Sequence, residues 1–258
     1  MSNAPDPTAT LRRLFGDDPV LSPTTDPDLA DYFGRFALDE VPAHGEVDEH
    51  TRLLAVLAAL IATTGRHAYR AMLASALDAG VSPAEAKEVT YHAVDYLGYG
   101  KAADFVRITN EELLERGVAL PLPSQSTTTP QTRFERGWDA QAAIIGAERL
   151  ASLHADALPD ERHLQDWLTA NCFGDNYTRG GIDLATRELL TFVLLVAHGG
   201  CDPQVRSHVA GNARVGNGRA RLLAVVSQLL PYIGYPRTLN GVAAIDAVLP
   251  ASGEGEQA

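Results

Sequence analysis

The sequence has few cysteines, few basic residues and no long apolar run. Two cysteines in 258 residues, Cys172 and Cys201, cannot form a disulfide framework, so we expect a reduced, cytoplasmic protein. Lys and Arg number 21 against 33 acidic residues, and a net charge of −12 argues against nucleic-acid and anionic-lipid partners. The longest apolar run, residues 53–62, is too short for a membrane span, which needs about twenty residues. The polar N-terminus does not resemble a signal peptide.

The sequence does contain an internal repeat, because residues 51–109 and 186–245 are two copies of one helical unit. Two short motifs mark the copies: TRLL and TREL at 51–54 and 186–189, and YLGYGK and YIGYPR at 96–101 and 232–237. The copies differ in polar residues: Glu188, Cys201 and His208 of the second copy align with Leu53, Arg66 and the Met72/Leu73 region of the first. This divergence predicts one working copy and one supporting copy.

Helix signals continue through most of the chain, and no period-two pattern is long enough for a sheet. The prediction is an all-α fold. We expect Ser82 and Asp183 to cap helices that end near Leu97 and Ala197, and Asp202 to cap the next one. The other expected helices cover residues 49–63, 134–154, 161–170, 219–230 and 236–248, with a turn at 173–177 and a break at Pro231.

Composition divides the chain into five segments. They are a flexible arm (1–28), a first repeat with a degenerate site (29–118), a Pro/Ser/Thr-rich linker (119–133), a second repeat with the expected active site (134–250) and a C-terminal tail (251–258).

Three residues of the second copy could carry chemistry. Glu188 lies in an apolar helix, Cys201 in a Gly-Gly-Cys-Asp-Pro turn before a helix, and His208 about one and a half turns into that helix. The helix dipole favours a thiolate at Cys201 and the charge of Asp202 opposes it, which leaves the direction of the pKa shift open. An imidazole beside a carboxylate can move protons, and beside a thiol it can activate a nucleophile. Each residue also has a structural alternative, as packing group, exposed imidazole or ion-pair partner.

Arg206 and Gln228 are the candidates for substrate binding. Residues two apart on a helix diverge by about 200°, so Arg206 and His208 cannot both face one pocket of the same subunit. His92 aligns with Gln228, and a hydrogen-bonded core position is the favoured interpretation of both. Asn212 follows His208 by one turn and could orient its ring. The spacing of the eight histidines predicts no metal site, and no motif predicts a cofactor.

The motifs TREL, GGC, RSH and PYIGYP, at 186–189, 199–201, 206–208 and 231–236, resemble the carboxymuconolactone decarboxylase family, which shares a superfamily with alkylhydroperoxidase D. The resemblance covers both copies. It implies an all-helical fold whose single-repeat members form rings of three or six, and hence a homo-oligomer, a trimer of two-repeat chains.

The resemblance also implies two chemistries for a small-molecule substrate. The first is a cofactor-free lyase or isomerase of carboxylated lactones or keto acids, in which Glu188 and His208 move protons and Cys201 tunes or joins the relay. The second is a thiol-dependent peroxidase using Cys201, although Gln204 stands where alkylhydroperoxidase D has its second cysteine. A non-catalytic helical scaffold is the third alternative.

Overall fold

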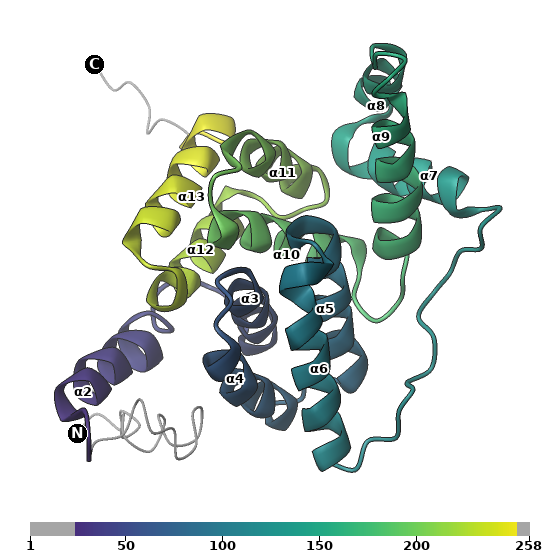
Figure 1. Ribbon diagram of the computed structural model, residues 1–258. Coiled ribbons are helices and arrows are strands. Elements are labelled where there is room, and N and C mark those ends of the chain that lie inside the picture. The colour runs from purple at the N-terminus through teal and green to yellow at the C-terminus, as the bar shows by residue number, and fades with distance from the viewer. Residues whose placement is uncertain (1–23, 252–258) are drawn as a thin grey trace, which may run out of the picture.

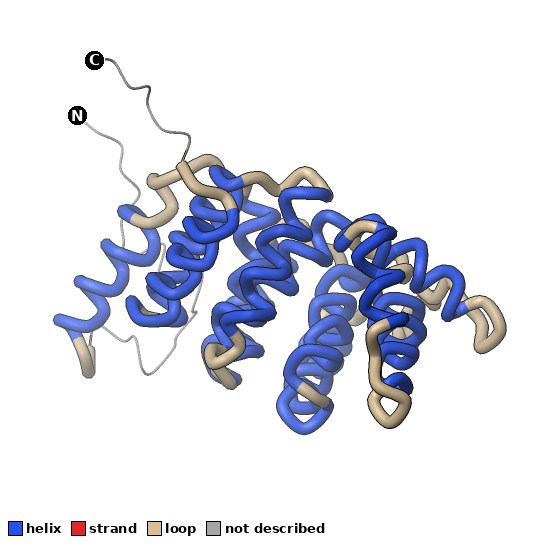
Figure 2. Tube along the Cα trace, turned by 90° about the horizontal axis from the view of Figure 1, so that it is seen from above, coloured by secondary structure: helices blue, strands red, loops and turns tan. Residues whose placement is uncertain are grey.

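The computed structural model describes residues 24–251, and this part of the chain consists of helices and loops without a strand (Figures 1 and 2). The predicted all-α fold is therefore confirmed. The first copy contains α2 (Pro27–Arg35), the π-helix η1 (Phe36–Glu40), α3 (Glu49–Ala62), α4 (Arg66–Asp78), α5 (Pro83–Leu97) and α6 (Tyr99–Glu115). The following elements are α7 (Arg133–Ile145), α8 (Ala147–Ala155), α9 (Arg162–Trp167), the π-helix η2 (Leu168–Tyr177), α10 (Leu184–His198), α11 (Asp202–Arg214), α12 (Arg219–Ile233) and α13 (Tyr235–Val248).

The centre of the molecule is formed by α3 and α10, which occupy equivalent positions in the two copies and pack against each other. Their side chains are buried around the whole circumference, from Leu53 to Ala62 and from Arg187 to Ala197. Each helix begins at an aspartate, Asp48 or Asp183, whose carboxylate accepts a hydrogen bond from the backbone N–H three residues later. Apolar sequence and local capping therefore explain both central helices.

Helices α5 and α12 are equivalent in the two copies, and each packs against the central helix of the other copy. Helix α5 of the first copy packs against α10 of the second, and α12 of the second packs against α3 of the first. Gly98 and Gly234 end α5 and α12 with φ of 79°, a conformation that suits glycine. The cross-packing places residues from the end of α5 beside the polar residues of α10.

The segment between the copies differs from the prediction in two places. Residues 134–154 form two helices rather than one, because Gly146 has φ of +92° and separates α7 from α8. Residues 173–177 are not a turn but the last part of η2. A side chain at Gly137 would overlap the Thr169 carbonyl and one at Gly174 would overlap that of Arg133, so the glycines allow α7 and η2 to pack backbone to backbone. Figure 1 shows α7–α9 at the edge of the molecule, apart from α2.

Three helix ends also differ from the sequence prediction. The N-cap of α11 is Cys201, and Asp202 is its first helical residue. Pro231 does not break α12, which continues to Ile233 and ends at Gly234. The last helix begins one residue before Pro236, at Tyr235. The predicted ends of α5 and α10 are confirmed to within one residue.

The linker between the copies is held against the loop that follows η2. The Gly180 N–H donates to the Gln125 carbonyl over 2.8 Å, and the Thr127 hydroxyl donates to the Thr178 carbonyl over 2.7 Å. Most of the predicted arm and tail, residues 1–23 and 252–258, lies outside the described residues, and α2 already begins within the predicted arm, at Pro27. Among the helices of residues 24–251, none has the length and apolar character that crossing a membrane requires.

Candidate functional site

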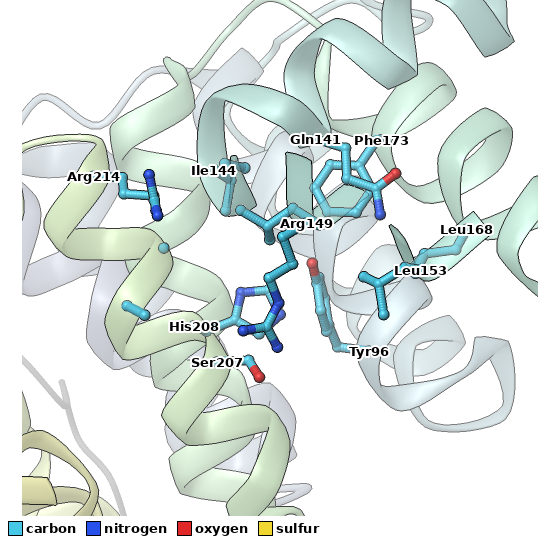
Figure 3. Close-up of a pocket in the computed structure, with 13 residues that line it drawn as sticks. Tyr96, Gln141, Ile144, Arg149, Leu153, Leu168, Phe173, Ser207, His208 and Arg214 are labelled. Carbon is cyan, nitrogen blue, oxygen red and sulfur yellow. The ribbon is translucent and has the colours of Figure 1, made fainter. Parts of the chain in front are cut away.

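A cavity of about 230 Å³ lies where α5, α7, α8, η2 and α11 meet (Figure 3). Its wall is mostly apolar and carries a few polar groups. The apolar wall includes Ile144, Ile145, Leu153, Leu168 and Phe173. The polar groups include Tyr96, Gln141, Arg149, Ser207, His208 and Arg214. An apolar cavity with a small number of polar groups is typical of a small-molecule site.

Glu188 and His208, predicted together from the sequence, meet at the inner wall of this cavity. His208 Nδ1 lies 2.7 Å from Glu188 Oε1. The Glu188 side chain is fully buried and that of His208 is 17% exposed. Gly211, one turn after His208, makes the contact possible, because a Cβ there would overlap the Glu188 carboxylate. With Nδ1 engaged by Glu188, Nε2 is the ring nitrogen left for a molecule in the cavity.

Two tyrosines extend the pair. The second oxygen of Glu188 accepts a hydrogen bond from the Tyr177 hydroxyl over 2.8 Å, and the Tyr96 hydroxyl donates to the Tyr177 oxygen over 2.9 Å. Burial raises the pKa of both phenols, so both stay protonated near neutral pH. Tyr96 lines the cavity and belongs to α5 of the first copy. The hydrogen-bonded chain therefore begins and ends at the cavity and draws on both copies.

Behind this chain lies an inner polar layer around His92, which is fully buried. Asn176 Nδ2 donates to Asp95 and to the Tyr91 carbonyl, so its Oδ1 faces His92 Nδ1 at 3.2 Å as an acceptor. His92 therefore carries its proton on Nδ1, and Nε2 lies 2.8 Å from the Thr191 hydroxyl. Burial, with the charge of Arg187, lowers the pKa of His92 to about 3, so the ring is neutral. The favoured interpretation of His92, a hydrogen-bonded core group, is confirmed.

The first copy lacks this constellation. At the offset of 135 residues that relates Thr51 to Thr186, the counterparts of Tyr177, Glu188 and Thr191 are apolar, and His208 falls at a Leu/Met pair. These counterparts are Pro42, Leu53, Val56 and Met72/Leu73. Tyr232, the counterpart of Tyr96, remains, and its buried hydroxyl has no hydrogen-bond partner among residues 24–251. The difference between the copies, predicted for Glu188 and His208, thus also includes Tyr177 and Thr191.

Cys201 does not join Glu188 and His208. Its thiol donates to the Leu195 carbonyl over 3.3 Å and lies in a separate, small depression beside Arg237. Burial raises the pKa of Cys201, and the charge of Asp202 raises it further. The direction left open by the sequence is thus upward. The thiol form of Cys201 therefore predominates near neutral pH.

The two predicted substrate-binding residues lie elsewhere. Arg206 is exposed and does not line the cavity, in agreement with its divergence from His208 on α11. Gln228 is buried and donates to the carbonyls of Val41 and His44, which ties α12 to the segment after η1. Asn212 does not orient the His208 ring, since its amide donates to the backbone carbonyls of Glu188 and His208.

Two arginines that the sequence did not single out line the cavity instead. Arg149 comes from α8 and Arg214 from the last turn of α11, and Figure 3 shows Arg149 extending toward His208. Neither forms an ion pair or hydrogen bond with another described residue, so both guanidinium groups are available to an anion. Arg149 lies outside the aligned copies, residues 51–109 and 186–245, so comparing them gives no signal for it. Within residues 24–251, no cluster of three or more His, Cys, Asp or Glu side chains has the arrangement of a metal site.

Comparison with known proteins yields one family. The model of the carboxymuconolactone decarboxylase family matches the chain twice, over residues 27–111 and 162–247, which together make up more than half of its length. The two matches contain the two copies, and the predicted tandem arrangement is confirmed. No curated protein matches the chain.

Proposed function

Because the chain belongs to the carboxymuconolactone decarboxylase family, we propose that it is a cofactor-free lyase or isomerase of small carboxylated lactones or keto acids, acting by acid–base chemistry. One observation carries the proposal: the buried Glu188 carboxylate holds His208 at the wall of a cavity that also contains two unpaired arginines. A carboxylate on Nδ1 orients the imidazole, so Nε2 can give and take a proton.

For a decarboxylation, the bond between the carboxylate carbon and the substrate's α-carbon breaks and CO2 leaves. The electron pair of that bond moves into the neighbouring carbonyl group to give an enolate. Protonated His208 then donates its Nε2 proton to carbon, and solvent returns a proton to the imidazole. In an isomerisation the same nitrogen removes a proton next to the carbonyl group and returns it to another carbon. Neither sequence needs an electron acceptor.

Arg149 and Arg214 supply the charges that this chemistry needs. A guanidinium binds a carboxylate through two parallel hydrogen bonds and also stabilises an enolate oxygen. Ile144 and Phe173 are buried and give the inner wall an apolar surface, and apolar surroundings favour the loss of charge as CO2 departs. The cavity of about 230 Å³ suits a substrate of small size.

The thiol peroxidase is the second candidate, and the position of Cys201 argues against it. A peroxidatic cysteine must be a thiolate with a base beside it, whereas burial raises the pKa of Cys201 and its hydrogen bond goes to a carbonyl. Gln204 at the second cysteine position leaves no resolving thiol on this helix.

The test is turnover of a panel of carboxylated lactones and β-keto acids, followed by CO2 release and by deuterium uptake into the product in D2O. Glu188→Gln and His208→Ala should each slow turnover by about 10²–10⁴-fold. Arg149→Leu should raise KM, while Arg206→Ala, a change outside the cavity on the same helix as His208, should leave the rate unaltered. Full activity of His208→Ala would refute the proposed chemistry.

A further inference from the structure

A second and larger cavity lies on the first copy, between α5, α6 and the linker. Its volume is about 600 Å³, within the range of cavities that hold small organic ligands. The linker residues Leu120–Gln125 form one wall and Tyr91, Lys87 and Asn110 line the helical side. None of the residues assigned to the acid–base chemistry lines it.

The charge in this cavity is concentrated at Lys87. The chain contains only two lysines, and Lys87 is 9% exposed. Its ammonium group donates to the Asn110 side-chain oxygen and has no carboxylate partner among the described residues. An ammonium group has three N–H donors, so two remain for a ligand. A largely buried and unpaired cation is costly, and a bound anion would offset that cost.

The neighbouring acidic residue cannot neutralise Lys87, because its charge is already shared. Glu88 is fully buried, and Arg179 holds both of its oxygens at 2.8–3.1 Å. Arg187 adds a third donor at 2.8 Å. The charge of Glu88 is therefore taken up by two arginines, and neither of its ion pairs involves Lys87.

The remaining wall favours an organic anion over a bare inorganic one. Lys87 Nζ lies 5.1 Å and Arg179 Cζ lies 5.3 Å from the centre of the Tyr91 ring, so one aromatic ring holds both cations at the cavity. Leu120, Leu122 and two prolines line the opposite side. Cations on one side and apolar surface on the other match a carboxylate attached to an apolar body.

We propose that this cavity, formed by Lys87, Arg179, Tyr91 and the linker, is a second ligand site that binds a small organic carboxylate. The site is distinct from the His208 cavity and does not depend on the function proposed there.

Titration calorimetry with benzoate as the probe tests this site. Lys87→Met should weaken benzoate binding by about tenfold or more, since it removes a charge-assisted contact. Lys101→Met is the matched control, because Lys101 is the other lysine and is exposed on α6 beside His198. The double variant Arg149→Leu, Arg214→Leu removes the guanidinium groups of the first cavity and should still bind benzoate.

A second variant keeps the test decisive if Lys87→Met does not fold. Asn110→Asp has nearly the same shape and places a carboxylate against Lys87, so it should abolish binding while circular dichroism stays unchanged. Unchanged affinity in both Lys87→Met and Asn110→Asp would overturn the proposal. Loss of all benzoate binding in the Arg149/Arg214 double variant, or binding of inorganic phosphate without benzoate, would overturn it as well.

Discussion

Tyr96 and Tyr232 occupy the same position in the two copies, yet their hydroxyl groups have different surroundings. The Tyr96 hydroxyl donates to Tyr177, whereas that of Tyr232 is buried without a partner. Tyr96→Phe should therefore slow turnover, because it disrupts the chain that holds Glu188. Tyr232→Phe should leave turnover unchanged and stabilise the fold by about 1 kcal/mol, since it removes an unsatisfied polar group. Turnover and urea unfolding of the two variants measure both effects.

The variants Tyr96→Phe and Tyr232→Phe also test whether only the second copy carries a working site. If Tyr232→Phe slowed the reaction as much as Tyr96→Phe, the first copy would hold a second working site. A loss of stability in Tyr232→Phe would mean that its hydroxyl has a partner in the folded protein.

Cys201 separates the two chemistries of the family. Its raised pKa predicts slow alkylation by iodoacetamide at pH 7 and a rate that increases with pH as the thiolate forms. Cys201→Ser should slow turnover only slightly, because the thiol touches neither Glu188 nor His208. Mass spectrometry after treatment with stoichiometric hydrogen peroxide tests the alternative chemistry. Rapid formation of a sulfenate at Cys201, coupled to peroxide turnover with an added thiol, would establish the peroxidase.

At the scale of residues, the sequence predicted the Glu188–His208 contact because both lie in the repeat and their counterparts are apolar. The same comparison could have drawn attention to Tyr177, which aligns with Pro42. It could not identify Arg149, because Arg149 precedes the aligned stretch 186–245 and its place at the cavity depends on how α8 packs.

At the scale of elements, helix starts were predictable where one side chain caps the helix. Ser82, for example, accepts from the Glu85 N–H while the Glu85 side chain accepts from the Ser82 N–H. The π-helix η2 was not predictable, since its form depends on backbone contact with α7 through Gly137 and Gly174. Pro231 misled the prediction because a proline near a helix end removes only one hydrogen bond, and Gly234 ends α12 three residues later.

His92 of α5 contacts Asn176 of η2 and Thr191 of α10, and its lowered pKa predicts that the free energy of unfolding decreases in acid. Its pKa is about 3 in the folded protein and 6.5 for an ordinary histidine, so the unfolded chain binds an extra proton between these values. Stability is therefore fully present above about pH 6.5 and falls as the pH drops toward 3, by up to about 1.4 kcal/mol per pH unit. His92→Gln should flatten this slope in urea unfolding between pH 7 and 4 and retain most activity, since Gln228 occupies the equivalent position.

His163→Gln is the control for this effect, because His163 is exposed on α9 and its replacement should leave the slope as it is. An unaltered slope in His92→Gln would show that other groups cause the acid sensitivity.

At the scale of the whole molecule, exposed apolar side chains predict association. Tyr99 and Tyr235, the first residues of α6 and α13, are 75% and 61% exposed, and Trp167 on α9 is 62% exposed. Such side chains at equivalent positions suit repeated contacts between copies. We expect a homo-oligomer, a trimer of two-repeat chains. Light scattering at micromolar concentration measures the mass, and a monomer would contradict the prediction.

The cross-packing of α5 with α10 has a consequence for how this chain can evolve. A ring of identical single units carries every substitution in every unit, so a residue needed at the catalytic centre cannot be lost from any of them. Fusion of two units removes that constraint, and the first unit has Leu53 and a Leu/Met pair where the second has Glu188 and His208. It still supplies Tyr96 and His92 to the centre of its neighbour. A second unit separated from the first would lack the Tyr96 contact to Tyr177, and a first unit alone would lack Glu188 and His208.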